Sequence, residues 1–595
     1  MKKIFLITII FLSTCFVQAQ DSKVFYYHNN KKIFLDVIEN SIIINFKNDV
    51  NEFQKDKILK KLVESNFTIS ELSKLSYCLS KDLVQFDFDD FFSKENIDKS
   101  YFYFSNMLIY KDSTILWTNN KITVNFNQTS DLFEVLIKND IPFINVDQIG
   151  SNQQTFVIEL EIDKINAIEY ANILEKSGYV NWAQPYFMKI IQNPKIYNQN
   201  LKRNNFEYND YINLEEAWYI SNGSGVRVAV IDDGVFLRHP DLENNFIDGF
   251  DATDHKCGGD THGGTFSCPA CPFKDDHGTM VSGLICAEGN NNHYFKGVAF
   301  EGKVIPIRIF YSDFNNYLYM CVLNCEPKWV VNGIKYAWEK DNVDVINNSW
   351  TGPPETLIEQ ELGYALKKGR DGKGCIVIFS SGNNGYNYVE HYGSLPNVIS
   401  VGGIDLYNKR VDNNVWGSQY GDSLNIVAPG DNVFTTDMSF NGYSIVSGTS
   451  FSASFVSGLA ALILSLNPNL TGQEVKDIIE STAQKINKYH PTENPNGYVY
   501  IDDPNHYPNG LWNEEVGYGL IDCFAALEAT CVENFSNQVV IGPIVEFERT
   551  VIGCNDLLVE NVIVPQHNKL TLNAPGKITI NGPFKVASGA QLKVK

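Results

Sequence analysis

The sequence predicts three successive folds: a split βαβ unit, a larger α/β domain built on a parallel sheet with helices on both faces, and a small all-β segment. Residues 121–190 read as strand, helix, strand, strand, helix and strand. From residue 214 onward, continuous apolar runs alternate with amphipathic helical patterns, which is typical of a parallel sheet covered on both sides. After residue 530 only short alternating strands with Gly, Asn and Pro turns remain.

The N-terminal residues have the composition of an export signal. Two lysines precede the apolar stretch Ile4–Val17, and Ala19 supplies a small residue near the predicted exit. Because the stretch is short for a bilayer, residues 1–19 are expected to be a signal peptide rather than a membrane anchor. A lipoprotein signal around Cys15 is the less favoured alternative. We therefore expect an exported protein, either secreted or held in the cell envelope or periplasm, with no later membrane span.

The composition argues against some classes of binding partner. The chain has 595 residues, which is enough for two to four domains, and 44% of them are apolar. Its formal net charge of −22 argues against nucleic acid or an anionic membrane as the main partner. The composition identifies no substrate, and we expect a monomer.

The cysteines suggest disulfides more than metal binding. Of the 12 cysteines, the signal peptide removes one and leaves an odd number. Three of them cluster with two histidines in residues 255–271, at a spacing that also fits zinc. In an exported chain we favour a loop tied by disulfides. Further candidate pairs are Cys321 with Cys325, and Cys531 with Cys554.

Polar residues end several of the predicted parallel strands. Asp232 ends the run VRVAVID, Ser349 follows VDVINN, and Asn383 follows CIVIFSSG. Functional groups in parallel α/β sheets lie at the carboxyl ends of the strands. We therefore expect these three side chains to lie near one another.

Asp232, His277 and Ser450 have the residue types and one of the known chain orders of a serine-nucleophile triad. A serine hydroxyl is a weak nucleophile at neutral pH, so an imidazole must take its proton, and a buried carboxylate fixes the imidazole tautomer. Ser450 is predicted to open a helix, where the positive dipole end and free N–H groups would face a developing oxyanion. The side-chain amide of Asn383 is a candidate second donor.

At these residues the sequence resembles the subtilisin-like serine peptidases, or subtilases. The matching motifs occur in family order between residues 214 and 529: VIDDG, HPDL, HGT, INNSW, SSGNNG, LPNVISVGG, VAPG and SGTS. The resemblance implies a secreted serine endopeptidase that works through an acyl-enzyme intermediate, with Asp232, His277 and Ser450 as triad and Asn383 in the oxyanion hole. It implies no cofactor for the chemistry and no assigned metal ligand, although structural calcium is common in the family.

Some details resemble the kexin-like branch of that family. Asp233 completes an Asp-Asp-Gly run, and we expect it either to shape the S2 side of the cleft or to be solvated. Ser349 and Trp350 are expected at the cleft rim, where their backbone could pair with an extended peptide. Glu355 is the candidate acid for a basic P1 side chain, although the inserted Thr351 departs from the branch motif.

The resemblance also covers the N-terminal part. The family's split βαβ (ferredoxin-like) propeptide folds beside the enzyme, assists its folding and blocks the cleft until it is removed. We expect residues 121–200 to be this inhibitor and residues 20–120 to be a further pro-region with a weakly similar pattern. The catalytic domain is expected over residues 205–530 and a β appendage over residues 531–595. Lys202-Arg203 in the linker is either a maturation site or simply two exposed basic residues.

A second class of function stays open, namely an inactive subtilase-fold protein that serves as an adhesin or binding module. The complete triad and Asn383 favour the peptidase, because a binding module has no need for four reactive groups. Ser454 stands where the family usually has proline, four residues after the nucleophile. We expect this change to alter the entry of the helix and not the reacting groups.

Overall fold

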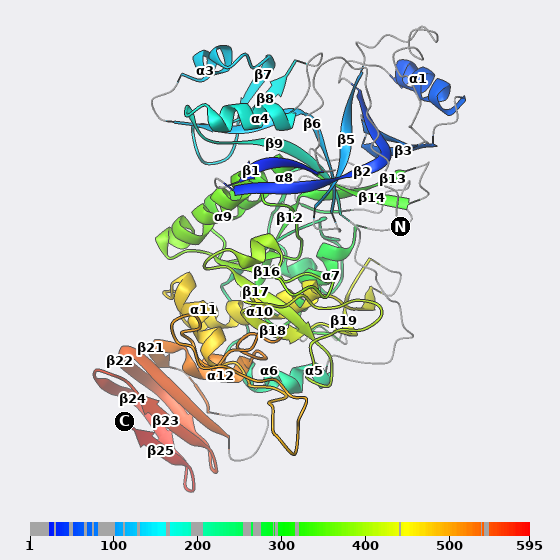
Figure 1. Ribbon diagram of the computed structural model, residues 1–595. Coiled ribbons are helices and arrows are strands. Elements are labelled where there is room, and N and C mark those ends of the chain that lie inside the picture. Colours follow the sequence, from blue (N-terminus) through cyan, green and yellow to red (C-terminus); the bar gives the residue numbers. More distant parts are fainter. Residues whose placement is uncertain are drawn as a thin grey trace.

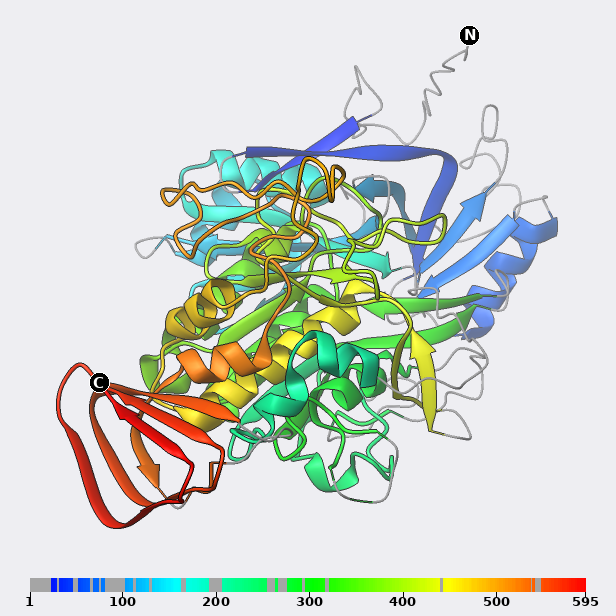
Figure 2. The same cartoon turned by 90° about the horizontal axis from the view of Figure 1, so that it is seen from below.

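The computed structural model describes residues 23–28, 31–46, 52–64, 68–73, 76–80, 102–110, 114–127, 131–161, 167–191, 206–253, 263–265, 275–289, 291, 295–315, 320–438, 442–536, 538–540 and 547–595. Figure 1 shows N-terminal strands at the top, a central α/β domain, and a C-terminal β segment at the lower left. Figure 2 shows this C-terminal segment on the side of the central domain away from the blue N-terminal strands.

The predicted split βαβ order is present in the second half of the N-terminal region. Its strands pair antiparallel in the order β9–β6–β8–β7, with α4 packed against the sheet. The apolar faces of α4 and β6 meet in a buried core that includes Ile122, Val124 and Leu174. The elements are β6 (Thr114–Phe126), α3 (Leu132–Lys138), β7 (Phe143–Gln148), β8 (Thr155–Leu160), α4 (Ala167–Lys176) and β9 (Val180–Ile191).

The first half of the N-terminal region repeats this topology in its described residues. Its strands pair in the order β5–β2–β4–β3, which is again fourth, first, third and second along the unit. The elements are β2 (Lys31–Phe46), α1 (Glu52–Glu64), β3 (Thr68–Ser73), β4 (Ser76–Ser80) and β5 (Phe102–Tyr110). Because β5 pairs with β6, the two units share one sheet. A short strand, β1 (Lys23–His28), pairs with the start of β2.

The central domain is built on a parallel sheet of seven strands in the order β11–β12–β10–β15–β16–β17–β18. Nearly every residue in these strands is buried, as continuous apolar runs require. The strands are β10 (Arg227–Asp232), β11 (Phe250–Asp251), β12 (Lys303–Arg308), β15 (Val345–Asn348), β16 (Ile376–Ser380), β17 (Ile399–Ile404) and β18 (Ile426–Pro429).

Helices cover both faces of this sheet, as predicted. On one face, α7 (His277–Cys286) and α10 (Thr449–Leu466) share a core with α11 (Gly472–Ser481) and α12 (Cys523–Ala529). On the other face, α8 (Pro327–Lys335) and α9 (Thr356–Lys368) form a second core. Among the described helices, α10 alone is long and apolar enough to cross a membrane, and 89% of its apolar window is buried inside the protein. Its composition therefore reflects a core helix.

A hairpin joins the N-terminal sheet to the central domain. It consists of β13 (Phe310–Asn315) and β14 (Met320–Cys325), and its second strand pairs antiparallel with the end of β9. The expected Cys321–Cys325 pair is wrong, because both residues lie in one extended strand. Four residues of strand span about 13 Å, which is beyond the reach of a disulfide.

The C-terminal all-β segment is a parallel coil. All of its strand pairs are parallel, and the pairs Glu548–Lys569 and Lys569–Gln591 show that one coil takes 21 or 22 residues. Parallel strands joined by such short connections form a solenoid, with apolar residues such as Leu570 inside it. The strands are β21 (Cys531–Ser536), β22 (Glu548–Val564), β23 (Lys569–Asn573), β24 (Ile578–Val586) and β25 (Gln591–Val594).

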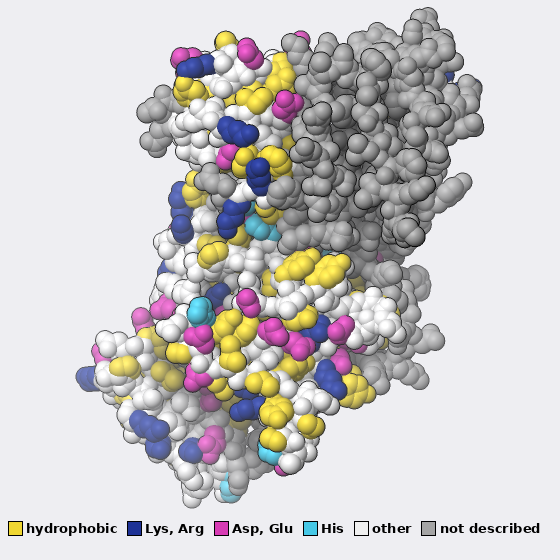
Figure 3. Space-filling view, in the orientation of Figure 1, with side chains coloured by type: hydrophobic (Ala, Val, Ile, Leu, Met, Phe, Trp, Pro, Cys, Tyr) yellow, Lys and Arg dark blue, Asp and Glu magenta, His cyan; other side chains and the backbone are white. Residues whose placement is uncertain are grey.

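The structure joins Cys531 and Cys554 in a disulfide at the start of this coil. Other sequence expectations lie outside the described residues: the signal peptide, the Cys/His cluster at 255–271 and Lys202-Arg203. On the described part of the face in Figure 3, acidic side chains intermingle with hydrophobic ones over the central domain, and the Lys and Arg side chains are scattered.

Candidate active site

Asp232 and His277 form a hydrogen-bonded pair at the carboxyl edge of the central sheet. Asp232 is the last residue of β10 and is 3% exposed, while His277 is the first residue of α7. The two carboxylate oxygens of Asp232 lie 2.9 and 3.0 Å from Nδ1 of His277. A carboxylate only accepts, so Nδ1 carries a proton and Nε2 is the basic nitrogen. Nε2 is buried and has no hydrogen-bond partner in the described part of the chain.

The environment of His277 tunes its basicity. Burial lowers the pKa of the imidazole, but the charge of Asp232 and the hydrogen bond to it raise that pKa, and Asp276 adds to the increase. The net effect is a pKa above the ordinary histidine value. An imidazole of raised pKa is a stronger proton acceptor in its neutral form.

Asp233 holds the backbone of the same helix. Its Oδ1 accepts the N–H of Gly278 at 2.8 Å and its Oδ2 accepts the N–H of His277 at 3.2 Å, so it satisfies two free donors at the start of α7. The side chain is 4% exposed, so the expectation of a solvated Asp233 is wrong. Asp232 thus orients the imidazole ring of His277, and the neighbouring Asp233 holds its backbone.

A buried arginine supports this turn. Arg308, at the end of β12, donates from Nε to the carbonyl of Asp233 at 3.1 Å and contacts Asp251 and Asp275 at 3.2 and 3.3 Å. It has no exposed surface. Its cation balances part of the negative charge gathered around the triad candidates. Burial raises the pKa of Asp233 well above its ordinary value, and the charges of Asp232 and Asp275 raise it further.

Ser450 lies at the start of α10, in the second helical position. Its Oγ donates to the carbonyl of Ser349 at 3.2 Å, and no hydrogen bond links it to His277. Rotation about the Cα–Cβ bond re-aims a serine hydroxyl, and apo active sites commonly have such loose geometry. The preceding Gly448 has φ of +152° and ψ of 157°, a conformation that is essentially restricted to glycine.

Asn383 is oriented by the residue before Ser450. Its Oδ1 accepts two hydrogen bonds from Thr449, from the backbone N–H and from the hydroxyl, each at 2.9 Å. These bonds settle which end of the amide faces Thr449. The Nδ2 donor is turned away from it and lies 3.5 Å from the place where a Cβ on Gly448 would stand.

The four predicted substrate-binding residues have different surroundings. Ser349 is next to the nucleophile candidate, since its Oγ donates to the carbonyl of Ser450 at 3.0 Å. The ring of Trp350 is buried among Phe310, Phe379 and Tyr392, so only its backbone is suited to the cleft rim.

Glu355 is 4% exposed at the N-terminal end of α9. Burial and the nearby Glu326 raise the pKa of Tyr186 on β9, and the charge of Glu355 adds to this. Glu355 therefore lies near the N-terminal sheet. Its predicted role in binding a basic P1 side chain stays a prediction.

Ser454 preserves the helix that carries the nucleophile candidate. Its Oγ donates to the carbonyl of Ser450 at 3.0 Å, one turn earlier, and α10 continues without a break to Leu466.

Sequence reasoning missed Arg308, Thr449 and Asp275. Arg308 interrupts the apolar run KVIPIRIF, and a charge inside a predicted buried strand was the available signal.

The described side chains offer no cluster of carboxylates for calcium. Within the ranges described above, the one close group of three His, Cys, Asp or Glu residues is His28, Glu359 and His391. It supplies a single carboxylate among two imidazoles, whereas calcium takes six to eight oxygen ligands.

The parallel sheet brings four side chains to one edge: an Asp–His pair, a serine at the start of a helix and an oriented asparagine. This is the architecture of the subtilisin-type serine peptidases. The comparisons agree with this class. Residues 223–519 match the model of the subtilase family. Subtilisin from Bacillus pumilus is 32% identical over 270 residues, which are 44% of this chain and 84% of that protein. The chain belongs to the subtilase family.

Other relatives are longer than the matched segment. The thermophilic serine proteinase of Bacillus sp. (strain AK1) is 32% identical over 282 residues, which cover 47% of this chain and 60% of that protein. The calcium-dependent protease of Trichormus variabilis (strain ATCC 29413 / PCC 7937) is 30% identical over 363 residues, 54% of this chain and 48% of that protein. The match thus spans about half to three fifths of these two relatives.

The crystal structure of fervidolysin from Fervidobacterium pennivorans, a keratinolytic enzyme related to subtilisin, has the same fold. Its TM-score is 0.51 at 22% identity, and the match covers 71% of this chain and 64% of that chain. The predicted subtilisin-like fold class is confirmed.

Proposed function

We propose that the protein is an exported serine endopeptidase that uses Asp232, His277 and Ser450 as its catalytic triad and is made as a self-processed zymogen. The observation that carries the proposal is the contact of Nδ1 of His277 with both carboxylate oxygens of Asp232, which accept its proton and leave Nε2 as the base on the edge of the sheet where Ser450 opens α10. The family membership supports the same activity.

In the proposed reaction, Ser450 Oγ rotates from the Ser349 carbonyl toward Nε2 of His277 and attacks the scissile carbonyl carbon. His277 takes the hydroxyl proton and then gives it to the leaving amine, while Asp232 stabilises the imidazolium. The acyl-enzyme on Ser450 is then hydrolysed by water, with His277 again as base. The backbone N–H of Ser450 and Nδ2 of Asn383 would bind the oxyanion.

The N-terminal units are proposed to act as an intramolecular inhibitor. The hairpin β13–β14 begins at the edge of the sheet where Asp232 lies. Strand β13 follows β12 directly, and between them the N–H of Ile309 donates to the Asp232 carbonyl at 2.8 Å. The end of β9 adds a strand to this hairpin by pairing with β14. A strand from the N-terminal region thus lies beside the candidate site, which supports the expected block of the cleft.

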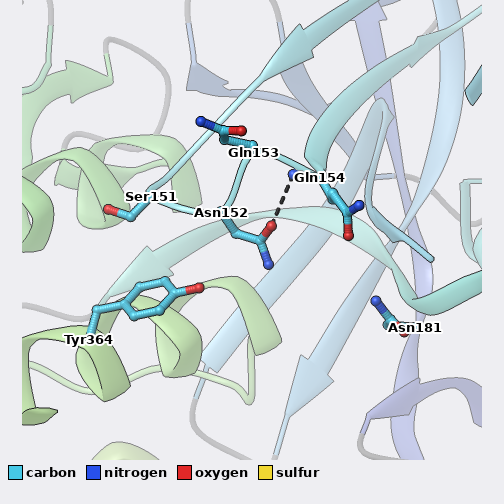
Figure 4. A pocket seen from close by; sticks show the side chains of 6 residues that line it. All are labelled: Ser151, Asn152, Gln153, Gln154, Asn181 and Tyr364. Carbon is cyan, nitrogen blue, oxygen red and sulfur yellow. Dashed lines mark hydrogen bonds between the residues drawn. The ribbon is translucent and has the colours of Figure 1, made fainter. Parts of the chain in front are cut away.

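The contact between β7–β8 and α9 has an apolar part and a polar edge, because Ile149 and Val157 lie in the same buried core as Leu357 of α9. Figure 4 shows an open crevice of about 580 Å³ lined by Ser151, Asn152, Gln153, Gln154, Asn181 and Tyr364. Beside it, Ser151 donates to Glu361 from its backbone N–H and its hydroxyl, at 3.1 and 2.7 Å. Release of the N-terminal region would therefore expose apolar surface as well as break these polar contacts.

Structural calcium is proposed only from the relatives, two of which are named calcium-dependent proteases. No step of the reaction needs it. The specific protein substrate is not part of the proposal.

The first test is intact-mass analysis of purified wild type beside Ser450→Ala. A self-maturing peptidase loses its first ~200 residues, up to the polar linker, and the variant stays whole. Ser454→Ala is the matched control, because it removes a hydroxyl one turn along the same helix, where it contacts only the backbone carbonyl of Ser450, and leaves the Ser450 hydroxyl in place. The new N-terminus shows whether cleavage follows Lys202-Arg203.

If wild type and Ser450→Ala both stay whole while folded and neither hydrolyses a casein substrate, the peptidase proposal is wrong and a binding module is favoured. If wild type stays whole but hydrolyses casein, only the self-processing part fails.

A further inference from the structure

A second cluster of ligating side chains lies at the seam between the N-terminal region and the central domain. His28 ends β1, Glu359 lies on α9, and His391 opens the short helix His391–Ser394. Nε2 of His28 lies 2.7 Å from Oε1 of Glu359, and Nε2 of His391 makes a still shorter contact with the same oxygen. We propose that His28, Glu359 and His391 bind a zinc ion that clamps the N-terminal region to the catalytic domain.

The donor set fits zinc better than other common cations. Two imidazole nitrogens and one carboxylate with an open fourth position form a recurrent zinc site. Calcium and magnesium prefer oxygen ligands throughout. The three donor atoms already lie within 4.8 Å of one another. Zinc–ligand bonds of about 2.0–2.2 Å at tetrahedral angles separate donors by about 3.4 Å, so the His28 contact with Glu359 must open by somewhat less than 1 Å and the shorter His391 contact by about 1 Å.

Polar side chains contact the ring of His28 on the side away from the proposed zinc. Its Nδ1 lies 3.1 Å from the hydroxyl of Thr356 and 2.9 Å from Nε2 of Gln184. The side-chain oxygen of Gln184, Oε1, accepts the Thr356 N–H at 2.9 Å, so the NH₂ group of the Gln184 side chain faces the His28 ring. Without metal, His28 therefore keeps its proton on Nε2 and donates it to Glu359.

Zinc on Nε2 changes this protonation pattern. The ring proton moves to Nδ1, where the Thr356 hydroxyl accepts it, as ligating histidines usually require. The Gln184 amide loses its hydrogen bond to the ring and keeps the one to the Tyr27 carbonyl at 3.0 Å. Zinc competes with protons for both imidazoles, so affinity falls as the pH is lowered.

Burial and geometry suit a cation at this position. His28 is 6% exposed, and the side chains of Glu359 and His391 are 14% and 19% exposed. Both histidines contact the same oxygen of Glu359, so the three donors already converge on one point.

The position of the site gives zinc a structural role. Tyr26, two residues before His28, is fully buried and donates to the carbonyl of Pro354 at 2.8 Å. Strand β1 thus covers the segment that leads from Ser349 into α9. The ligands come from both sides of the linker at residues 192–205, so the clamp would persist after cleavage there.

The test uses the full chain with Ser450→Ala, which excludes self-cleavage whether or not the peptidase proposal holds. Chelator-stripped protein is titrated with Zn²⁺ by calorimetry, and bound zinc is counted by elemental analysis. Glu359→Gln and His391→Ala should each lose one zinc equivalent or bind it at least tenfold more weakly. His506→Ala, which removes an exposed histidine that contacts Asp503 at 2.7 Å, should bind as the parent does.

Any zinc bound at other positions, such as residues 255–271, should be the same in the parent and in the three variants. The difference in zinc content between the parent and each variant therefore reports on the proposed site alone. Cobalt substitution gives a second readout, because a tetrahedral Co²⁺ site has visible absorption bands that Glu359→Gln should remove. Circular dichroism establishes that each variant is folded. Equal zinc stoichiometry and affinity in the parent, Glu359→Gln and His391→Ala would overturn the proposal, as would the absence of zinc binding to the parent.

Discussion

Replacing Asn383 with alanine should lower kcat about 10²–10³-fold and leave KM nearly unchanged. Thr449 holds the Oδ1 of Asn383 with two hydrogen bonds of 2.9 Å, so the amide is oriented before substrate binds. A donor that meets charge only in the tetrahedral intermediate stabilises the transition state and not the bound substrate. Removing one such donor typically costs about 3–4 kcal/mol, which corresponds to this loss in rate.

The assay compares kcat and KM for one chromogenic peptide across three variants. Asn383→Asp keeps the acceptor for Thr449 but replaces the donor with a negative charge, so its kcat should fall at least as far. Thr449→Val keeps the donor and removes one of the two orienting bonds. Loss of a hydrogen bond worth about 1 kcal/mol predicts a decrease of about fivefold. A higher KM with unchanged kcat in Asn383→Ala would refute the reasoning, provided that its thermal midpoint matches wild type.

Four further predictions follow from the site and the coil. Asp232→Asn should lower kcat by about 10⁴-fold, because the new NH₂ group can donate to Nδ1 of His277 and so hold that nitrogen unprotonated; single-turnover kinetics measure this loss. In wild type, kcat/KM should fall with decreasing pH, with a midpoint at a pKa above the usual histidine value. Burial raises the pKa of Asp233 in the folded state, so its contribution to stability is present below the unfolded pKa of about 3.9 and is lost as pH rises through the folded value. In the Ser450→Ala background, Asp233→Asn should flatten this part of the pH dependence of urea unfolding, and unchanged slopes would contradict the assignment. Cys554→Ser opens a loop of 23 residues and should destabilise the C-terminal coil by about 3 kcal/mol, seen as an earlier calorimetric transition, while peptide hydrolysis stays the same.

The positions of Asp232, Ser349 and Asn383 could be predicted because the rule behind them is geometric. Parallel strands of one sheet end at one edge, and β10, β15 and β16 are neighbours in that sheet. Chain order and residue type then predicted His277 and Ser450 as the other two members of the proposed triad. These inferences need only the ends of strands and the starts of helices, which local sequence patterns carry well.

The details of side-chain contact could not be predicted in the same way. The capping role of Asp233 depends on how α7 meets the turn after β10, and the burial of Trp350 depends on rings from three other segments. The parallel coil was missed because alternation of apolar and polar residues is the same in parallel and antiparallel strands. The available signal was the spacing of 21 to 22 residues between similar strands such as Lys569–Asn573 and Gln591–Val594.

The contacts of the N-terminal region affect the step that would activate the proposed zymogen. Cleavage of the linker leaves the pairing of β9 with β14, the bonds from Ser151 to Glu361, and the bond from Tyr26 to Pro354 all intact. These contacts come from the second unit and from β1, which belong to one continuous sheet, so they must be lost together rather than one at a time. Dissociation of that sheet, and not hydrolysis of the linker, is therefore expected to limit the rate at which the proposed active site opens.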